Sequence, residues 1–163
     1  MLIRIIGIGS PFGDDACGLE VARILAEAPP PNCEVIVADR PGVSLLELMR
    51  GIDAAILIDA VRSGARAGTL HELSFDDVAR CAARFVSSHD MGVAEAVALA
   101  RKLGCAPERG KIFAIEIAPA PARRAFTLSQ TMRPALKRAL DRVRSWAEEL
   151  SRESAVSGHP PTA

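Results

Sequence analysis

The sequence has few aromatic side chains and no excess of either charge. Its 163 residues include one Trp, no Tyr and 5 Phe, and 20 basic residues balance 20 acidic ones. Proteins that bind nucleic acid usually carry a basic excess, and those that bind single strands stack the bases on aromatic rings. Both signals are missing, so we expect no nucleic-acid partner.

Long apolar runs are also missing. No uninterrupted stretch approaches the roughly 18 apolar residues that a membrane span requires. The apolar N-terminal stretch, residues 1–8, is interrupted by Arg4 and followed at once by Gly9 and Pro11, unlike a secretory signal. We therefore expect a cytoplasmic protein without a membrane partner.

Paired cysteines and the common catalytic motifs are absent as well. Cys17, Cys33, Cys81 and Cys105 occur singly, without a C-x-x-C pair, which argues against a zinc knuckle or a thioredoxin-like site. We expect buried, reduced thiols. Neither G-x-S-x-G nor H-E-x-x-H occurs, so these two hydrolytic schemes are unsupported.

What is present is an alternation of β-branched apolar segments with amphipathic ones, at a length that suits one domain. The segment at 53–60 is apolar on both faces, as in a central strand covered by helices on both sides. We predict an α/β three-layer sandwich with a mostly parallel sheet of about five strands. The domain should cover residues 1–150, followed by a disordered tail at 151–163. The predicted strands are 2–8, 34–38, 53–60, 68–73 and 111–118. The predicted helices are 19–28, 44–50, 93–103 and 129–150, with a loose helix at 74–85, and the expected caps are Ser44, a residue of 87–90 and Ser129.

A glycine-rich loop at 7–13 (GIGSPFG) connects the first strand to the first helix, which is the context of a nucleotide-binding loop. The third glycine comes one position late, and two negative charges, Asp14 and Asp15, follow where phosphates would lie. No Gly-Lys-Ser/Thr follows either. Nucleotide binding is therefore the weaker alternative.

Asp14 and Asp15 precede the first helix, where a carboxylate commonly acts as an N-cap. Only one of them can occupy that position, so the other is free to face a ligand. The local sequence does not decide between them.

Two further residues stand where α/β proteins bind ligands. Asp59 ends the most apolar strand, and His89 precedes the helix expected from Val93. Considered singly, each is more often structural, Asp59 in a turn with 62–65 and His89 as a cap or core residue. Together with an aspartate of the glycine loop they form a set of oxygen and nitrogen ligands for Zn²⁺, Ni²⁺ or a similar ion. His71 and His159 fit this set less well.

Three segments, GIGSPFGDDACG at 7–18, IDA at 58–60 and SHDMG at 88–92, resemble the nickel-iron hydrogenase maturation peptidases in order and spacing. The resemblance extends over residues 1–150 and implies that Asp15, Asp59 and His89 are the metal ligands and the catalytic residues. It implies an endopeptidase that removes a C-terminal extension from a hydrogenase large-subunit precursor after nickel insertion. The nickel would come with the substrate, and the enzyme would be a monomer.

The sequence departs from this family at two places. Ser10 stands where Asn is frequent, and Asp39-Arg40-Pro41-Gly42 stands where Asp-Gly-Gly-Thr is common. We expect Arg40 and Pro41 to stiffen a loop beside the cleft and to add a positive charge there. Two alternatives remain at this point: a metal-sensing or chaperone-like binding module without hydrolysis, and a nucleotide-binding module.

Overall fold

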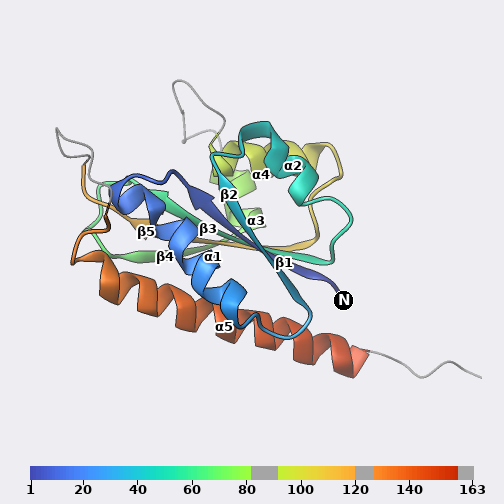
Figure 1. The fold of residues 1–163 in the computed structure, drawn as a ribbon. Coiled ribbons are helices and arrows are strands. Elements are labelled where there is room, and N and C mark those ends of the chain that lie inside the picture. Colours follow the sequence, from blue (N-terminus) through green and yellow to red (C-terminus); the bar gives the residue numbers. More distant parts are fainter. Residues whose placement is uncertain (82–91, 120–126, 158–163) are drawn as a thin grey trace, which may run out of the picture.

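The computed structural model describes residues 1–81, 92–119 and 127–157. They form a five-stranded sheet in the order β2-β1-β3-β5-β4 (Figure 1). Four strands are mutually parallel, and β4 pairs antiparallel with β5 at one edge. The strands are β1 (Ile3–Gly9), β2 (Cys33–Asp39), β3 (Ala54–Val61), β4 (Leu70–Ser74) and β5 (Arg109–Glu116).

Helices cover both faces of the sheet, which confirms the predicted three-layer α/β fold (Figure 1). One core lies between the sheet and helices α1 (Cys17–Glu27) and α5 (Met132–Ser157). The other lies between the sheet and the helices α2 (Leu45–Leu48), α3 (Phe75–Cys81) and α4 (Val93–Lys102). None of the helices in the described residues is long and apolar enough to cross a membrane.

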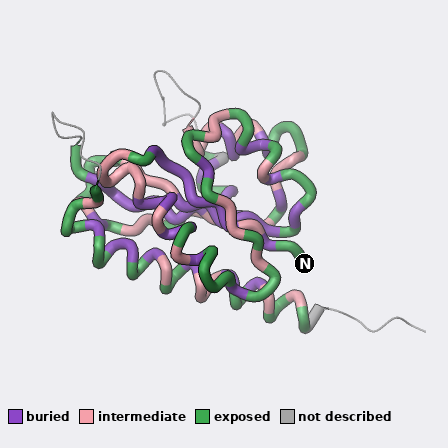
Figure 2. The backbone as a smooth tube through the Cα atoms, viewed as in Figure 1, coloured by how far each residue is buried: buried purple, intermediate pink, exposed green. Residues whose placement is uncertain are grey.

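Strand β3 contributes to both cores because alternate side chains of a strand point to opposite faces. Ile56 and Ile58 join the α1/α5 core, whereas Ala55 and Leu57 join the other. All four are fully buried, and Figure 2 shows the buried residues along the centre of the sheet. The apolar run at the start of β3 is thus explained by its central position.

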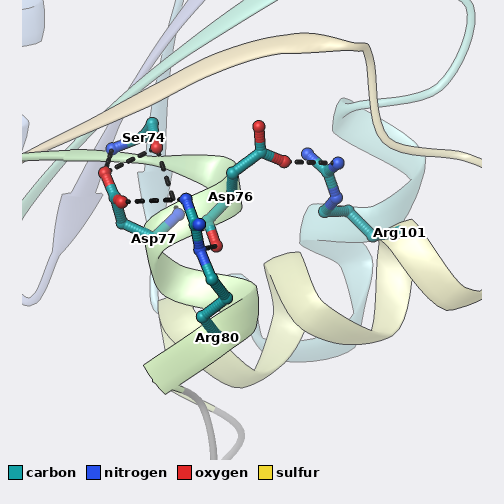
Figure 3. A network of polar contacts seen from close by, with 5 residues as sticks. All are labelled: Ser74, Asp76, Asp77, Arg80 and Arg101. Atoms are coloured by element: carbon teal, nitrogen blue, oxygen red, sulfur yellow. Dashed lines mark hydrogen bonds and ion pairs between the residues drawn. The ribbon is translucent and has the colours of Figure 1, made fainter.

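Helix α3 begins with a capping arrangement that the sequence analysis left unresolved. The Ser74 hydroxyl donates to Asp77 at 2.6 Å, and the Asp77 backbone N–H donates back to that hydroxyl at 3.1 Å (Figure 3). Asp76 forms an ion pair with Arg101 of α4 at 2.6 Å, which joins the two helices. Of the loose helix expected at 74–85, the part beyond residue 81 lies outside the described residues.

The predicted start of α4 at Val93 is confirmed, whereas the starts of the other helices differ from the prediction. The segment at 44–50 is divided into a 3-10 turn, η2 (Gly42–Ser44), and α2, and the Ser44 hydroxyl donates to the Pro41 carbonyl instead of capping. Helix α4 starts after Gly92, whose N–H donates to the Glu95 carboxylate at 2.7 Å. The caps predicted at 87–90 lie outside the described residues.

The predicted start of a tail at Ser151 is too early, because α5 continues to Ser157. Two contacts hold this last part of the helix to the body. The Ser151 hydroxyl donates to the Pro31 carbonyl at 2.9 Å, and Glu153 forms an ion pair with Arg109 of β5. Residues 158–163 lie outside the description.

Candidate functional site

The site lies at the carboxyl end of β1 and β3, where the strand order changes direction. From β1 the chain goes to β2 on one side, and the later strand β3 pairs on the other side. In open α/β sheets this switch point leaves a crevice in which ligands bind. The loop after β1 carries Asp15, and β3 carries Asp59 near its end.

Two glycines bring α1 close to this edge. A Cβ on Gly18 would lie 2.2 Å from the Ile8 carbonyl oxygen and 2.5 Å from that of Ile58, and a Cβ on Gly7 would lie 2.2 Å from the Gly18 carbonyl oxygen. Only glycine permits such contact between backbones. A third glycine, Gly9, has its Cβ position 2.1 Å from the Asp15 carbonyl oxygen. These glycines therefore serve contacts within the protein and not the approach of a phosphate.

Asp14 and Asp15 have different partners, and neither caps α1. A 3-10 turn, η1 (Gly13–Ala16), precedes the helix and contains both residues, so the N-cap position falls on Ala16 and the predicted aspartate cap is wrong. The Asp14 carboxylate accepts hydrogen bonds from the N–H and hydroxyl of Ser129, at 2.7 and 2.8 Å. Asp14 thus joins the start of α1 to the segment before α5, and Ser129, which was expected to cap that helix, bonds to Asp14 instead.

The Asp15 carboxylate accepts hydrogen bonds from the Ser10 N–H at 3.0 Å and the Ser10 hydroxyl at 2.5 Å. Both bonds end on the same oxygen, Oδ2, which leaves Oδ1 without a hydrogen bond from the described residues. Asp15 also lines two neighbouring cavities. Of the two adjacent carboxylates, Asp15 is the one available for a ligand.

Asp59 is half-buried and lines the smaller cavity together with Asp15; the cavity has a volume of about 260 Å³. Asp59 Oδ1 accepts the Ala60 N–H at 2.8 Å. Burial raises the pKa of Asp59 to about 7, the Ala60 hydrogen bond opposes this shift, and the negative charge of Asp15 adds to it. A positive charge between the two carboxylates would relieve their repulsion.

The third predicted ligand, His89, lies outside the described residues. Gly92 and Val93, at the start of α4, line the same small cavity as Asp15 and Asp59. Within residues 1–81, 92–119 and 127–157, no three His, Cys, Asp or Glu side chains gather as a metal site. The structure therefore places two of the three predicted residues on one cavity, and the triad as a whole stays a prediction.

A buried glutamate that the sequence analysis missed orders the loop after β3. The Glu116 carboxylate accepts hydrogen bonds from the N–H groups of Ser63 and Gly64, at 2.8 and 3.0 Å, and from the Ser63 hydroxyl at 2.7 Å. His71 Nε2 lies 3.1 Å from the same carboxylate. A buried carboxylate requires hydrogen-bond partners. The charged residue at the end of the apolar segment IFAIE at 112–116 was the feature of the sequence that could have indicated such a cluster.

Two cysteines, Cys17 beside the site and Cys33 at the amino end of β2, have thiols with raised pKa values. Burial, and then the negative charges of Asp59 and Asp15, raise the pKa of Cys17 to about 12. Burial raises the pKa of Cys33 to about 11. Both thiols stay protonated at neutral pH, as expected for structural cysteines.

A larger cavity of about 710 Å³ adjoins the smaller one, and Asp15 and Arg40 line both. Arg40 has φ 43°, a left-handed conformation that favours glycine, and its N–H donates to the Gly9 carbonyl at 3.0 Å. Its guanidinium donates to Asp39 at 2.7 Å and lowers the pKa of that carboxyl group. The expected positive charge beside the cleft is therefore present.

The fold and site define a class: an α/β protein with an acidic cavity at the switch point of its sheet and a glycine loop used for internal packing. The model of the hydrogenase maturation protease family matches residues 19–146. The chain therefore belongs to this family, and it is a peptidase of hydrogenase maturation.

Individual relatives agree with this assignment. The hydrogenase expression/formation protein HupD of Rhodobacter capsulatus is 26% identical over 162 residues, which cover 95% of this chain and 77% of the relative. HupD of Thiocapsa roseopersicina is 29% identical over 110 residues, 65% of this chain and 50% of the relative. The structure of the hydrogenase maturating endopeptidase HybD from Escherichia coli superposes with a TM-score of 0.78 at 24% identity, covering 91% of this chain and 93% of that one.

Proposed function

We propose that this peptidase removes the C-terminal extension of a hydrogenase large-subunit precursor after nickel has entered the precursor. The observation that carries the proposal is the pair of carboxylates, Asp15 and Asp59, on one small cavity. Neither forms an ion pair with a residue in the described part of the chain. Two carboxylates that line one cavity and repel each other are suited to bind a cation, and oxygen ligands fit a divalent metal ion.

His89 is the third ligand in this proposal. The resemblance of the 88–92 segment to the family supports it, and so does the position of Gly92 and Val93 in the wall of the same cavity. Three protein ligands leave coordination positions open for groups of the substrate. Asp15, Asp59 and His89 would thus bind nickel that the precursor already holds, and the enzyme would recognise a loaded precursor by its metal.

The chemistry of the step follows from such an arrangement. A metal ion beside the scissile bond polarises the peptide carbonyl or activates a water molecule. Burial and the charge of Asp15 raise the pKa of Asp59 to about 7 in the free protein, and a bound cation would favour its charged form, which is the form that ligates a metal. We place the reaction in the cytoplasm. We take the enzyme to be a monomer that binds one precursor.

The test is to incubate the purified protein with nickel-loaded and nickel-free precursor of the matching hydrogenase and to measure the mass of the large subunit. We expect loss of the extension from the loaded precursor alone. Unchanged mass of the loaded precursor would contradict the proposal. An intact precursor held in a nickel-dependent complex would favour the metal-sensing module instead.

Alanine variants test which residues the peptidase activity requires. Alanine at Asp15, Asp59 or His89 should abolish processing while the thermal unfolding midpoint stays near that of the wild type. Asp141→Asn is the matched control, since Asp141 is an exposed carboxylate on α5, paired with Lys137. Full processing by any one alanine variant would remove that residue from the site.

A further inference from the structure

The larger cavity has the size and lining of a peptide site. Its volume of about 710 Å³ lies within the range of cavities that bury drug-sized ligands. Phe12, Ile117 and Leu128 supply apolar surface, and Ser10 and Thr131 supply hydroxyl groups. Asp15 and Arg40 line both cavities, so a segment bound in the larger cavity would lie directly beside the smaller one.

The charged side chains that line the larger cavity differ in whether they have a hydrogen-bond or ion-pair partner in the described chain. Asp14 accepts hydrogen bonds from Ser129, Asp15 accepts them from Ser10, and Arg40 pairs with Asp39. Arg62 is exposed and forms no hydrogen bond or ion pair with any residue of the described chain. Its guanidinium is therefore the one positively charged group of the described lining that has no partner within the described chain.

The backbone on both sides of Arg62 is fixed. Before it, the Val61 carbonyl accepts the Ile117 N–H at 2.9 Å. After it, the N–H groups of Ser63 and Gly64 donate to the buried carboxylate of Glu116. The loop is also held further along, where the Gly68 N–H donates to the Glu116 carbonyl at 2.8 Å. An arginine on a backbone held in this way loses less freedom when it binds a ligand than one on a loose loop.

We propose that Arg62 binds a carboxylate of the peptide segment that the enzyme removes, and that the larger cavity is the subsite for this segment. The inference rests on the proposed function. Asp14, Asp15 and Asp59 repel a carboxylate from the rest of the site, so Arg62 determines where it binds and thereby the register of the peptide. A guanidinium group suits this role because it binds a carboxylate through two parallel hydrogen bonds.

The first experiment measures KM and kcat for the nickel-loaded precursor with wild type, Arg62→Gln and Arg62→Lys. We expect Arg62→Gln to raise KM about tenfold with kcat nearly unchanged, because the lost contact stabilises the bound substrate and the transition state alike. Arg62→Lys should recover part of the affinity. Arg66→Gln is the matched control, since Arg66 is an exposed arginine of the same loop that does not line either cavity.

The second experiment identifies the carboxylate. One precursor carries an amide in place of its C-terminal carboxylate, and another has the acidic side chains of its extension replaced by the corresponding amides. The source is the group whose neutralisation raises KM for the wild type and leaves KM of Arg62→Gln unchanged. The increase in KM that neutralisation causes in the wild type should also become smaller at high salt, because salt screens a charge pair at a solvent-exposed rim.

Different experimental outcomes would contradict this inference and the proposed function. If the wild type processes the precursor and Arg62→Gln has the same KM, or if neither neutralised precursor binds more weakly to the wild type, Arg62 is not the carboxylate site. If the wild type leaves the loaded precursor intact, the proposed function fails, and this inference fails with it. Equal unfolding midpoints for the variants show that a change in KM is not a folding defect.

Discussion

Two adjacent carboxylates, Asp14 and Asp15, face different partners and should have separable effects. Asp14→Ala removes two hydrogen bonds to Ser129 and should lower the free energy of unfolding by about 1 kcal/mol, with kcat for the precursor retained. Asp15→Ala should leave stability nearly unchanged, because the lost Ser10 contacts are offset by relief of repulsion with Asp59, and should abolish processing. Urea unfolding and precursor mass measure the two effects.

Measuring both alanine variants also shows which of Asp14 and Asp15 belongs to the active site, a question that the local sequence left open. An inactive Asp14→Ala protein beside an active Asp15→Ala protein would reverse their roles. The distinction depends on Ser129, which lies 115 residues from Asp14 in the sequence. No local pattern could have predicted that contact, whereas the resemblance to the family selected Asp15.

At Glu116 the prediction concerns stability and its pH dependence. Burial alone would raise the pKa of this carboxyl group, but the hydrogen bonds from Ser63, Gly64 and His71 outweigh it and lower the pKa below the usual 4.5. The charged form therefore stabilises the fold at pH values above about 4.5, and this contribution is lost as the pH falls through the lowered folded pKa. Glu116→Gln should reduce the free energy of unfolding by roughly 1–3 kcal/mol at neutral pH, and the difference from wild type should shrink in acid.

Denaturant titrations at neutral and acid pH test this. Glu148→Gln serves as the control, because Glu148 is exposed on α5 and forms no hydrogen bond or ion pair within the described chain. A difference that grows as the pH falls would mean that Glu116 is protonated in the folded protein.

For the element α1, the close approach to the sheet depends on Gly18. Alanine normally stabilises a helix interior by about 1 kcal/mol relative to glycine. Here the added Cβ would lie 2.2 Å and 2.5 Å from two strand carbonyl oxygens, so α1 must move away from the sheet. We expect Gly18→Ala to lower the free energy of unfolding by about 3 kcal/mol and to reduce processing, because α1 carries the Asp15 turn with it.

Gly51→Ala is the matched control. Gly51 has φ 70° and open space around its Cβ position, so alanine there costs only the backbone strain of about 1–2 kcal/mol. Equal losses in the two variants would show that packing of α1 on the sheet is not the reason for Gly18.

The strands could be predicted from the composition of short segments, whereas the residues at which the helices start could not. Segments such as 53–60 are apolar because both faces of a central strand are buried, and that is visible in composition alone. The starts of α1 and α5 depend on whether a nearby carboxylate or hydroxyl caps the helix or forms a hydrogen bond with a residue far away in the sequence. The predicted caps at Asp14 or Asp15 and at Ser129 were wrong because Asp14 and Ser129 bond to each other, whereas Asp15 bonds to Ser10.

On the scale of the whole molecule, the candidate site could be predicted as far as sheet topology determines it. Parallel strands place the end of β1 beside the end of β3, so Asp15 and Asp59 line one cavity, as the position of Asp15 after the first strand and of Asp59 at the end of the third strand indicated. The second cavity could not be predicted, because its wall combines the β1–α1 loop with Ile117 and Leu128, whose proximity requires the folded chain. The same is true of Arg62, which depends on Glu116 of another strand.

The arrangement of the whole molecule also predicts that nucleotides do not bind. The glycine loop closes on its own chain at Gly9, and the crevice beside it presents Asp15 and Asp59 where a phosphate would need cations. A nucleotide present at about 100 times its Kd would stabilise the fold by about 2.7 kcal/mol, which corresponds to a rise in Tm of roughly 5–11 °C for a domain of this size. We expect no rise with ATP or NAD at millimolar concentration. A concentration-dependent rise that persists in Asp15→Ala would restore the nucleotide-binding alternative, since that alternative alone has no need of the carboxylate.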